Sequence, residues 1–181
     1  MRKIRKAFKR PLRPWDATRI KDQRALMNQY GLTRNIEVLR AESMVRDFRQ
    51  RTRKLIATKK DADVKTLLAK LEKLGVIKHG QGLDDVLALN TTSILERRLQ
   101  TIVFRKGLAR TPRQARQCIV HNHVEIAGRK INIPSYIVPV NEEEKIKLAD
   151  GVVKEKPAPA KDTTVHADVS PKAGEQAESG E

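Results

Sequence analysis

Hydrophobic and polar positions change their period within residues 93–138, which makes this stretch the most informative part of the chain. The first part has a helical period. Ser93 and Glu96 have the spacing of a capping box, so a helix is predicted to begin there, run to Lys106 and end at the following glycine. A second helix is predicted to follow Thr111, an N-cap residue that precedes a proline at the first helical position and a glutamine at the third.

Apolar and basic side chains separate onto different faces of both predicted helices. The apolar positions are Leu95, Leu99, Ile102 and Val103 in the first helix and Ala115, Cys118 and Ile119 in the second. The polar positions that project elsewhere include Arg97, Arg98, Arg105, Arg113, Arg116 and Gln117. This pattern predicts a core-facing stripe and an exposed arginine surface suited to gripping folded RNA. The alternative is an ordinary small αβ unit whose arginines only face solvent.

The period changes to two after His121, which predicts a β-hairpin. The expected elements are a strand over residues 124–126, a turn over 127–130, a strand over 131–133, a further short strand near 136–138 and a last helix over 142–149.

Four more helices are predicted upstream. They cover about residues 17–30, a longer stretch from Thr33 or Asn35 to about Ala57, a stretch from Asp61 or Asp63 to about residue 74, and residues 83–89. Asp16 is expected to cap the first helix and Gly31 to end it. The apolar stripe of the second helix is predicted as Ile36, Leu39, Met44, Phe48, Leu55 and Ile56. Its remaining surface is crowded by Arg40, Arg46, Arg49, Arg51, Arg53 and Lys54. A bound polyanion would relieve the repulsion among these charges.

Net charge is +16 over 181 residues and is concentrated at one end of the chain. Residues 1–60 hold 19 Lys and Arg against five Asp and Glu, whereas residues 151–181 hold four against six. A localised basic excess is typical of proteins that bind a polyanion. An anionic membrane is the alternative polyanion, but we find no apolar run that could span one and no secretory signal. A membrane-surface role would also leave the capped helices and the hairpin unexplained, so no membrane partner is expected.

Little in the sequence points to catalysis or metal binding. Cys118 is the one cysteine, so the chain can form no internal disulfide and no cysteine-based zinc site, and a reducing, cytosolic setting fits. No carboxylate pair, Ser/His/Asp arrangement or metal-ligand spacing stands out, and Gly80-Gln81-Gly82 is predicted as a turn because it lacks the spacing of a phosphate-binding loop. We therefore expect no enzyme activity, cofactor or metal.

Aromatic residues make up only 3% of the chain. Proteins that bind single strands by stacking bases usually display several aromatic side chains on one surface. The composition therefore favours recognition of phosphates and RNA shape over recognition of splayed bases.

The chain resembles the S-four family of small-subunit ribosomal proteins over about residues 11–149. The residues that carry the resemblance in the module are 95–101 (LERRLQT), 107–109 (GLA), 115–117 (ARQ), 121–124 (HNHV) and 133–136 (IPSY). Upstream, Pro14-Trp15, Tyr30-Gly31-Leu32 and residues 83–89 (LDDVLAL) are similar to the archaeal and eukaryotic branch. The length and the lack of a long eukaryotic-type insertion favour the archaeal side.

Three departures from the family pattern matter. Thr111 is followed by Pro112 where many relatives have an arginine, which here comes at Arg113. Asn122 stands where many relatives have glycine, and asparagine tolerates a positive φ better than most residues. The cysteine zinc cluster of some bacterial members is absent.

The resemblance implies an α+β fold, a mainly helical domain interrupted by a small RNA-binding module of two helices plus a β-hairpin. The expected organisation is a basic extension (1–15), a helical rRNA-binding domain (16–92), the module (93–140), a C-terminal helix (141–150) and a disordered tail (151–181). The implied function is early binding of small-subunit rRNA at a multi-helix junction of the 5′ domain. Implied partners are a neighbouring protein of the S-five family and mRNA where it enters the subunit, with an influence on decoding accuracy.

The candidate RNA-binding residues are Arg97, Arg98, Arg105, Lys106, Arg110, Arg113, Arg116, Gln117, His121 and His123 in the module and Arg40, Arg46, Arg49, Arg53 and Lys54 upstream. Arg97 and Arg98 have an alternative role in surface ion pairs with Glu96, and the two histidines in stabilising their turn.

Rival functions are an RNA-modifying enzyme, disfavoured because no catalytic domain accompanies the module, and a non-ribosomal rescue factor, disfavoured by the upstream domain. A histone-like DNA binder would not use the hairpin.

Overall fold

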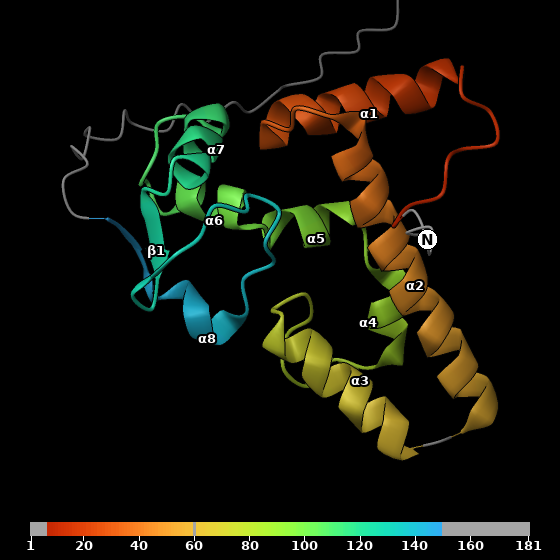
Figure 1. The fold of residues 1–181 in the computed structure, drawn as a ribbon. Coiled ribbons are helices and arrows are strands. Elements are labelled where there is room, and N and C mark those ends of the chain that lie inside the picture. Colours follow the sequence, from red (N-terminus) through yellow and green to blue (C-terminus); the bar gives the residue numbers. More distant parts are fainter. Residues whose placement is uncertain (1–6, 60, 150–181) are drawn as a thin grey trace, which may run out of the picture.

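The computed structural model describes residues 7–59 and 61–149 of the chain. Figure 1 shows a helical lobe (residues 7–96) beside a module (residues 97–149) that contains a small sheet. The helical lobe contains α1 (Ala17–Tyr30), α2 (Asn35–Thr58), α3 (Asp61–Lys73), α4 (Leu83–Ala88) and α5 (Thr91–Glu96). The module contains α6 (Leu99–Arg105), α7 (Pro112–Val120), β1 (Val124–Ile126), β2 (Arg129–Lys130), α8 (Val140–Glu143) and β3 (Ile146–Leu148). The α+β class is confirmed, and the tail expected over 151–181 lies outside the described residues.

Local signals set both ends of α1 as predicted. The Asp16 carboxylate accepts a hydrogen bond from the Thr18 amide at 3.2 Å and so satisfies one of the free amides at the helix start. Gly31 ends the helix with a φ of 60°, a left-handed conformation that a side chain would disfavour. The same chemistry ends α3, where Gly75 has a φ of 66°.

The buried face of α2 differs in part from the predicted stripe. Leu39 is buried, and Phe48 and Leu55 pack against the core, as predicted. Val38, Ala41, Val45 and Thr52 are buried, at spacings of three, four and seven residues that keep them on one side of the helix. Ile36, Met44 and Ile56, which were predicted to face the core, are 38%, 41% and 45% exposed. The prediction failed at these three positions because apolar side chains lie on both sides of this helix, and only contacts with the other helices determine which side is buried.

Two hydrophobic cores correspond to the two lobes. The core of the helical lobe includes Tyr30, Val38, Leu71, Val86, Ile94 and Leu95. The core of the module includes Leu99, Ile102, Val103, Ala115, Ile119, Val124 and Val138. The predicted stripe of residues 95–103 is thus buried, but it is divided between the two cores.

The helix predicted over residues 93–106 is interrupted at Arg97 and Arg98. The carbonyl of Arg97 accepts from the Val138 amide at 3.0 Å, and the Leu99 amide donates to the Tyr136 carbonyl at 2.8 Å. Arg98 therefore forms an isolated antiparallel bridge with the segment predicted as a short strand. This pairing with residues 136–138 replaces the helical hydrogen bonds at that point. The capping box at Ser93 is also wrong, because α5 begins two residues earlier, after Asn90.

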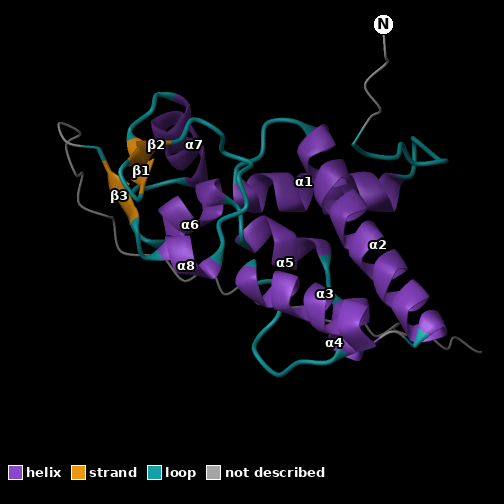
Figure 2. Cartoon of the chain, turned by 60° about the horizontal axis from the view of Figure 1, so that its bottom comes forward, coloured by secondary structure: helices purple, strands orange, loops and turns teal. Residues whose placement is uncertain are grey.

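The sheet has three antiparallel strands in the order β2-β1-β3 (Figure 2). Ala127 and Gly128, with φ values of 50° and 79°, form the hairpin turn, so residues 129–130, predicted as part of the turn, are in β2. The helix predicted over 142–149 is wrong beyond α8. Ile146 and Leu148 alternate with Lys147 in β3, where Ile146 pairs with Ile126 and fills the second edge of β1.

Candidate nucleic-acid interface

Three arginines of α2 line one polar groove. Arg46, Arg49 and Arg53 follow each other at intervals of three and four residues, so they share a helix face. They line a groove of about 560 Å³ whose opposite wall contains Asn90 and Thr91, the residues where α5 begins. Guanidinium groups present several donors in a fixed plane that matches phosphate oxygens. The groove therefore presents guanidinium donors that suit phosphate groups.

Arg49 is the fixed member of this groove. Its Nη2 donates to the carbonyl of Leu89 at 2.5 Å, which ties α2 to the segment between α4 and α5. Arg46 and Arg53 on either side are exposed. One carboxylate also lines the groove, that of Glu42, and it accepts from the Gln23 amide nitrogen at 3.3 Å. The groove thus keeps an excess of two positive charges.

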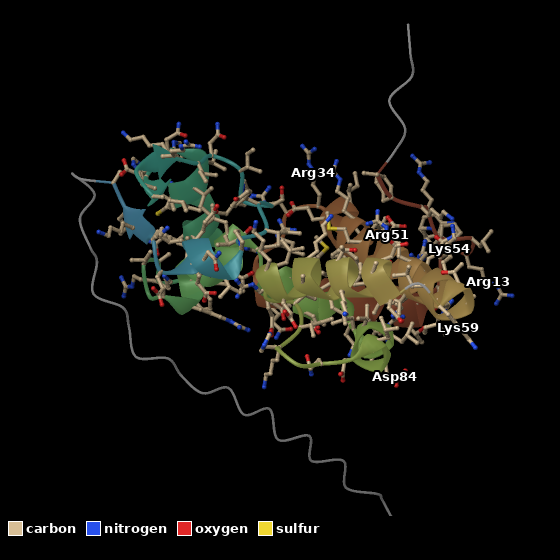
Figure 3. All side chains as sticks on the ribbon, turned by 90° about the horizontal axis from the view of Figure 1, so that it is seen from below. Arg13, Arg34, Arg51, Lys54, Lys59 and Asp84 are labelled. Atoms are coloured by element: carbon tan, nitrogen blue, oxygen red, sulfur yellow. The ribbon has the colours of Figure 1, made fainter. Side chains whose placement is uncertain are left out.

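The other two upstream candidates lie on different sides of α2. Arg40 is exposed at the rim of a cavity of about 250 Å³ that is also lined by Glu37 and Arg98. Lys54 lines a shallow apolar hollow between α2 and α3. Figure 3 shows Arg34 and Lys59 projecting outward at the two ends of the helix. Cations therefore follow α2 along its whole length, but only three of the five predicted residues share the groove.

A second basic surface lies at the start of α7 and on its outer face. Its exposed residues are Arg110, Arg113 and Gln117. The Thr111 hydroxyl accepts from the Gln114 amide at 3.1 Å, so the predicted N-cap is confirmed. The Gln114 side chain accepts from the Arg110 amide at 2.8 Å, which fixes the approach to the helix. Arg113 and Gln117 are exposed on the outer face, and Ala115 and Ile119 are buried on the inner face as predicted.

Arg98 does not lie on an exposed face, which corrects the prediction for this residue. The side chain is only 6% exposed, and its Nη2 lies 2.5 Å from Oε2 of Glu37 in α2. Arg116 of α7 approaches the same carboxylate, with 3.1 Å between its Nη1 and Oε1 of Glu37. Burial by itself would raise the pKa of Glu37, but hydrogen bonds and charge from Arg98 and Arg116 outweigh it and lower that pKa. A largely buried ion triad therefore joins the helical lobe to the module.

Arg97 also links elements rather than projecting from a helix. Its Nη1 lies 2.7 Å from the Glu143 carboxylate, and its Nη2 donates to the Val138 carbonyl at 2.9 Å. Neither arginine forms the predicted ion pair with Glu96, which pairs instead with Arg105 at 2.8 Å.

The remaining candidates of the module are exposed. Lys106 donates to the backbone carbonyl of Glu143, while its side chain stays at the surface. His121 and His123 flank Asn122, whose φ of 59° confirms the expected turn. The two imidazole rings stack with their centroids 6.2 Å apart, so they face solvent as a pair next to the end of α7.

Gln100 is a second link between the lobes and was not singled out by the sequence. Its side-chain nitrogen lies within hydrogen-bonding distance of three carbonyls, those of Tyr30 and Gly31 at the end of α1 and Pro112 at the start of α7, at 3.0–3.1 Å. The side chain is buried. In the sequence, Gln100 is one polar position within a predicted helix, and nothing in that pattern indicates hydrogen-bond partners 70 positions away. Together with the triad, Gln100 fixes α7 relative to α1 and α2, so the two basic surfaces keep one spacing.

The described residues contain neither a membrane-spanning helix nor a cluster of metal ligands. No helix there combines the length and the apolar character needed to cross a membrane. Within residues 7–59 and 61–149, no cluster of three or more His, Cys, Asp or Glu side chains could hold a metal ion.

Comparison with known proteins covers both lobes. A family model described as the S4 domain matches residues 97–143. The small ribosomal subunit protein uS4 of Methanococcus aeolicus is 48% identical over 149 residues, which cover 80% of this chain and 84% of that protein. The uS4 proteins of Hyperthermus butylicus and Methanothermobacter thermautotrophicus are 45% and 44% identical, over 82% and 80% of this chain and 86% of each relative. The chain therefore belongs to the uS4 family of small-subunit ribosomal proteins, on its archaeal side.

Proposed function

We propose that the chain is a structural constituent of the small ribosomal subunit that binds its rRNA directly and early, at a multi-helix junction of the 5′ domain. The observation that carries the proposal is the fixed pairing of two basic surfaces, the α2 groove of Arg46, Arg49 and Arg53 and the outer face of α7. The relatives of the chain are named as small ribosomal subunit proteins, which supports rRNA as the polyanion.

Phosphate contacts supply most of the affinity in this mechanism. Each arginine or lysine that neutralises a phosphate releases condensed counterions, so binding weakens steeply as salt rises. For roughly 6–10 phosphate contacts, the affinity falls on the order of 10³–10⁵-fold between about 50 and 200 mM salt. The charge on α2 and α7 is sufficient for contacts of this number.

Specificity comes from the arrangement of RNA helices. The major groove of A-form RNA is deep and narrow, so side chains cannot reach its base edges, and proteins recognise the shape of the backbone instead. Gln100 and the Glu37 triad hold the two basic surfaces at a fixed spacing. The protein therefore selects RNA whose phosphates have the same spacing. A junction whose helices present phosphates at the matching spacing binds both surfaces, whereas a single straight duplex reaches only one.

In the mature subunit we place the protein beside a neighbouring protein of the S-five family and near the path by which mRNA enters. There it contributes to decoding accuracy without catalytic chemistry of its own. Its cellular location is that of the ribosome, the cytoplasm. The candidates Arg105, Lys106, Arg110, Arg113, Gln117, His121 and His123 remain the proposed contacts of the module.

Binding to naked rRNA tests whether the protein acts early. The purified chain is mixed with full-length small-subunit rRNA and separated from free protein by sedimentation. We expect one copy per rRNA in the absence of other proteins, and one copy per small subunit after high-salt washing of ribosomes. A chain that binds only after other proteins are present, or that is lost on washing, would contradict an early structural role and favour a transient factor.

A further inference from the structure

The one tryptophan of the chain lies in solvent. Trp15 is 89% exposed, and Leu12 nearby is fully exposed. A tryptophan side chain has a large apolar surface, and its removal from water is among the strongest contributions a single residue makes to binding. Neither residue contributes to the cores of the two lobes. An indole kept out of the folded core is available for a binding partner.

The backbone around Trp15 is held in place. The Nη2 of Arg19 donates to the carbonyls of Arg13 at 3.1 Å and Pro14 at 2.9 Å, one residue before the indole. On the other side, Asp16 caps α1. Trp15 therefore sits between two fixed points in the free protein. Less conformational entropy is lost when a fixed group binds a partner than when a flexible one does.

The charges near Trp15 indicate what kind of partner would bind there. Lys9, Arg10 and Arg13 are exposed in the same segment. The nearby carboxylate of Asp16 is engaged by the amide and hydroxyl of Thr18, at 3.2 and 2.7 Å. An aromatic ring among exposed cations matches a nucleotide, whose base stacks on the ring while its phosphates meet the cations. An apolar pocket on an acidic protein would also accept an indole among cations, and it is an outcome that the test below distinguishes; the proposed rRNA binding favours the nucleotide.

We propose that Trp15 is a stacking platform for an unpaired base of the rRNA, with Arg10 and Arg13 on the flanking phosphates. The proposal rests on the proposed rRNA binding and extends it, because the composition otherwise favours contacts with phosphates alone. In Figure 1 the segment before α1 runs along the end of the molecule far from the sheet, and in Figure 3 Arg13 points outward from its edge. The platform thus lengthens the interface beyond α2.

Intrinsic fluorescence gives a direct test, because the emission of the only tryptophan reports Trp15 alone. The full chain is titrated with a 5′-domain rRNA fragment and, separately, with inorganic polyphosphate, which offers phosphates without bases. We expect the RNA to quench the emission and to protect the indole from acrylamide, and polyphosphate to do neither.

Affinity for the same rRNA fragment completes the test. Trp15→Ala should bind about 5- to 150-fold more weakly, the range expected for loss of one stacked base, and Trp15→Phe should stay within about threefold of the wild type. Ile133→Ala, which removes an apolar side chain that is 53% exposed in the module, is the matched control and should bind normally. Thermal melting of all variants checks that the fold is intact.

The outcomes separate the two proposals. Tight RNA binding with unchanged fluorescence and normal binding by Trp15→Ala would overturn the platform and leave the rRNA role standing. Normal binding of the RNA fragment by Trp15→Ala, together with poor incorporation of this variant into small subunits, would overturn it in favour of a protein contact. Equal quenching by polyphosphate would mean that phosphate binding nearby, rather than stacking, alters the emission. A wild type that fails to bind the RNA would overturn both proposals.

Discussion

The Glu37 carboxylate lies 2.5 Å from the Arg98 guanidinium, although 61 positions separate the two residues in the chain. Glu37 belongs to α2 and Arg98 precedes α6, so this pair crosses the boundary between the helical lobe and the module. Arg116 of α7 shares the same carboxylate. Glu37, together with Gln100, therefore fixes the relative position of the two basic surfaces.

Glu37→Ala should strongly destabilise the protein. The substitution leaves the Arg98 guanidinium buried without a counter-charge, and breaking a buried ion pair in this way costs about 3–5 kcal/mol. The measurement is the free energy of unfolding from urea titration. Glu96→Ala is the matched control, because its pair with Arg105 is exposed on both sides and should contribute less than about 1 kcal/mol. Equal losses in the two variants would show that the buried pair has no special role.

The Glu37 interaction should also make stability depend on pH. The pKa of Glu37 lies below its ordinary value of 4.5 in the folded protein, so the unfolded chain takes up the proton at a higher pH than the folded chain does. The stabilisation is complete above about pH 4.5 and is lost as pH falls through the lowered pKa. In urea titrations between about pH 6 and 3, the difference between wild type and Glu37→Gln should shrink with acid. A constant difference would exclude this linkage.

Gly31 tests the contact between α1 and α7. A Cβ built on Gly31 would lie 2.7 Å from the Cβ of Pro112, in a residue whose φ is already +60°. Gly80 is the matched control, because its φ is +83° but a Cβ there would meet nothing within 4 Å. Both alanine variants carry the backbone strain, so Gly31→Ala should lose about 1–3 kcal/mol more than Gly80→Ala. Similar losses of stability in the two variants would mean that the contact between the two lobes can shift to accept the added methyl group at little cost.

Sequence patterns located the elements whose signals are local. The caps at Asp16 and Thr111 and the glycine at Gly31 act within one helical turn, so each could be predicted from a few residues. The break at Arg97, by contrast, depends on hydrogen bonds to a segment about 40 residues later. A helix pattern contains no information about such a partner.

The candidate site also combines features that local sequence predicts with features that depend on residues far apart in the chain. The arginines of α2 were visible as a crowded surface, but the groove has a second wall at Asn90 and Thr91 that only the packing of α2 against α5 creates. Arg98 had the helical position of an exposed cation, and its burial depends on Glu37, which precedes it by 61 positions. Charge composition thus predicted the class of ligand, whereas the division of arginines between structural and binding roles required the fold.

The α2 groove should contribute a measurable share of RNA affinity. Arg46→Gln combined with Arg53→Gln removes two exposed cations from the groove, so the slope of log affinity against log salt should fall by about two. Lys65→Gln combined with Lys78→Gln removes the same charge from exposed positions outside the groove. Filter binding of the 5′-domain fragment compares the two double variants. Equal slopes would mean that overall charge, and not the groove, binds the RNA.

The most direct test of the account compares two RNAs with the wild-type chain. Affinity is measured between about 50 and 200 mM salt for a 5′-domain fragment that contains the multi-helix junction and for a duplex of equal length. We predict a steep salt dependence for both RNAs and a clear preference for the junction that persists at the higher salt, because only the junction meets both basic surfaces at once. Equal affinity for the junction and the duplex across this range would contradict recognition of RNA shape and would leave a general polyanion binder.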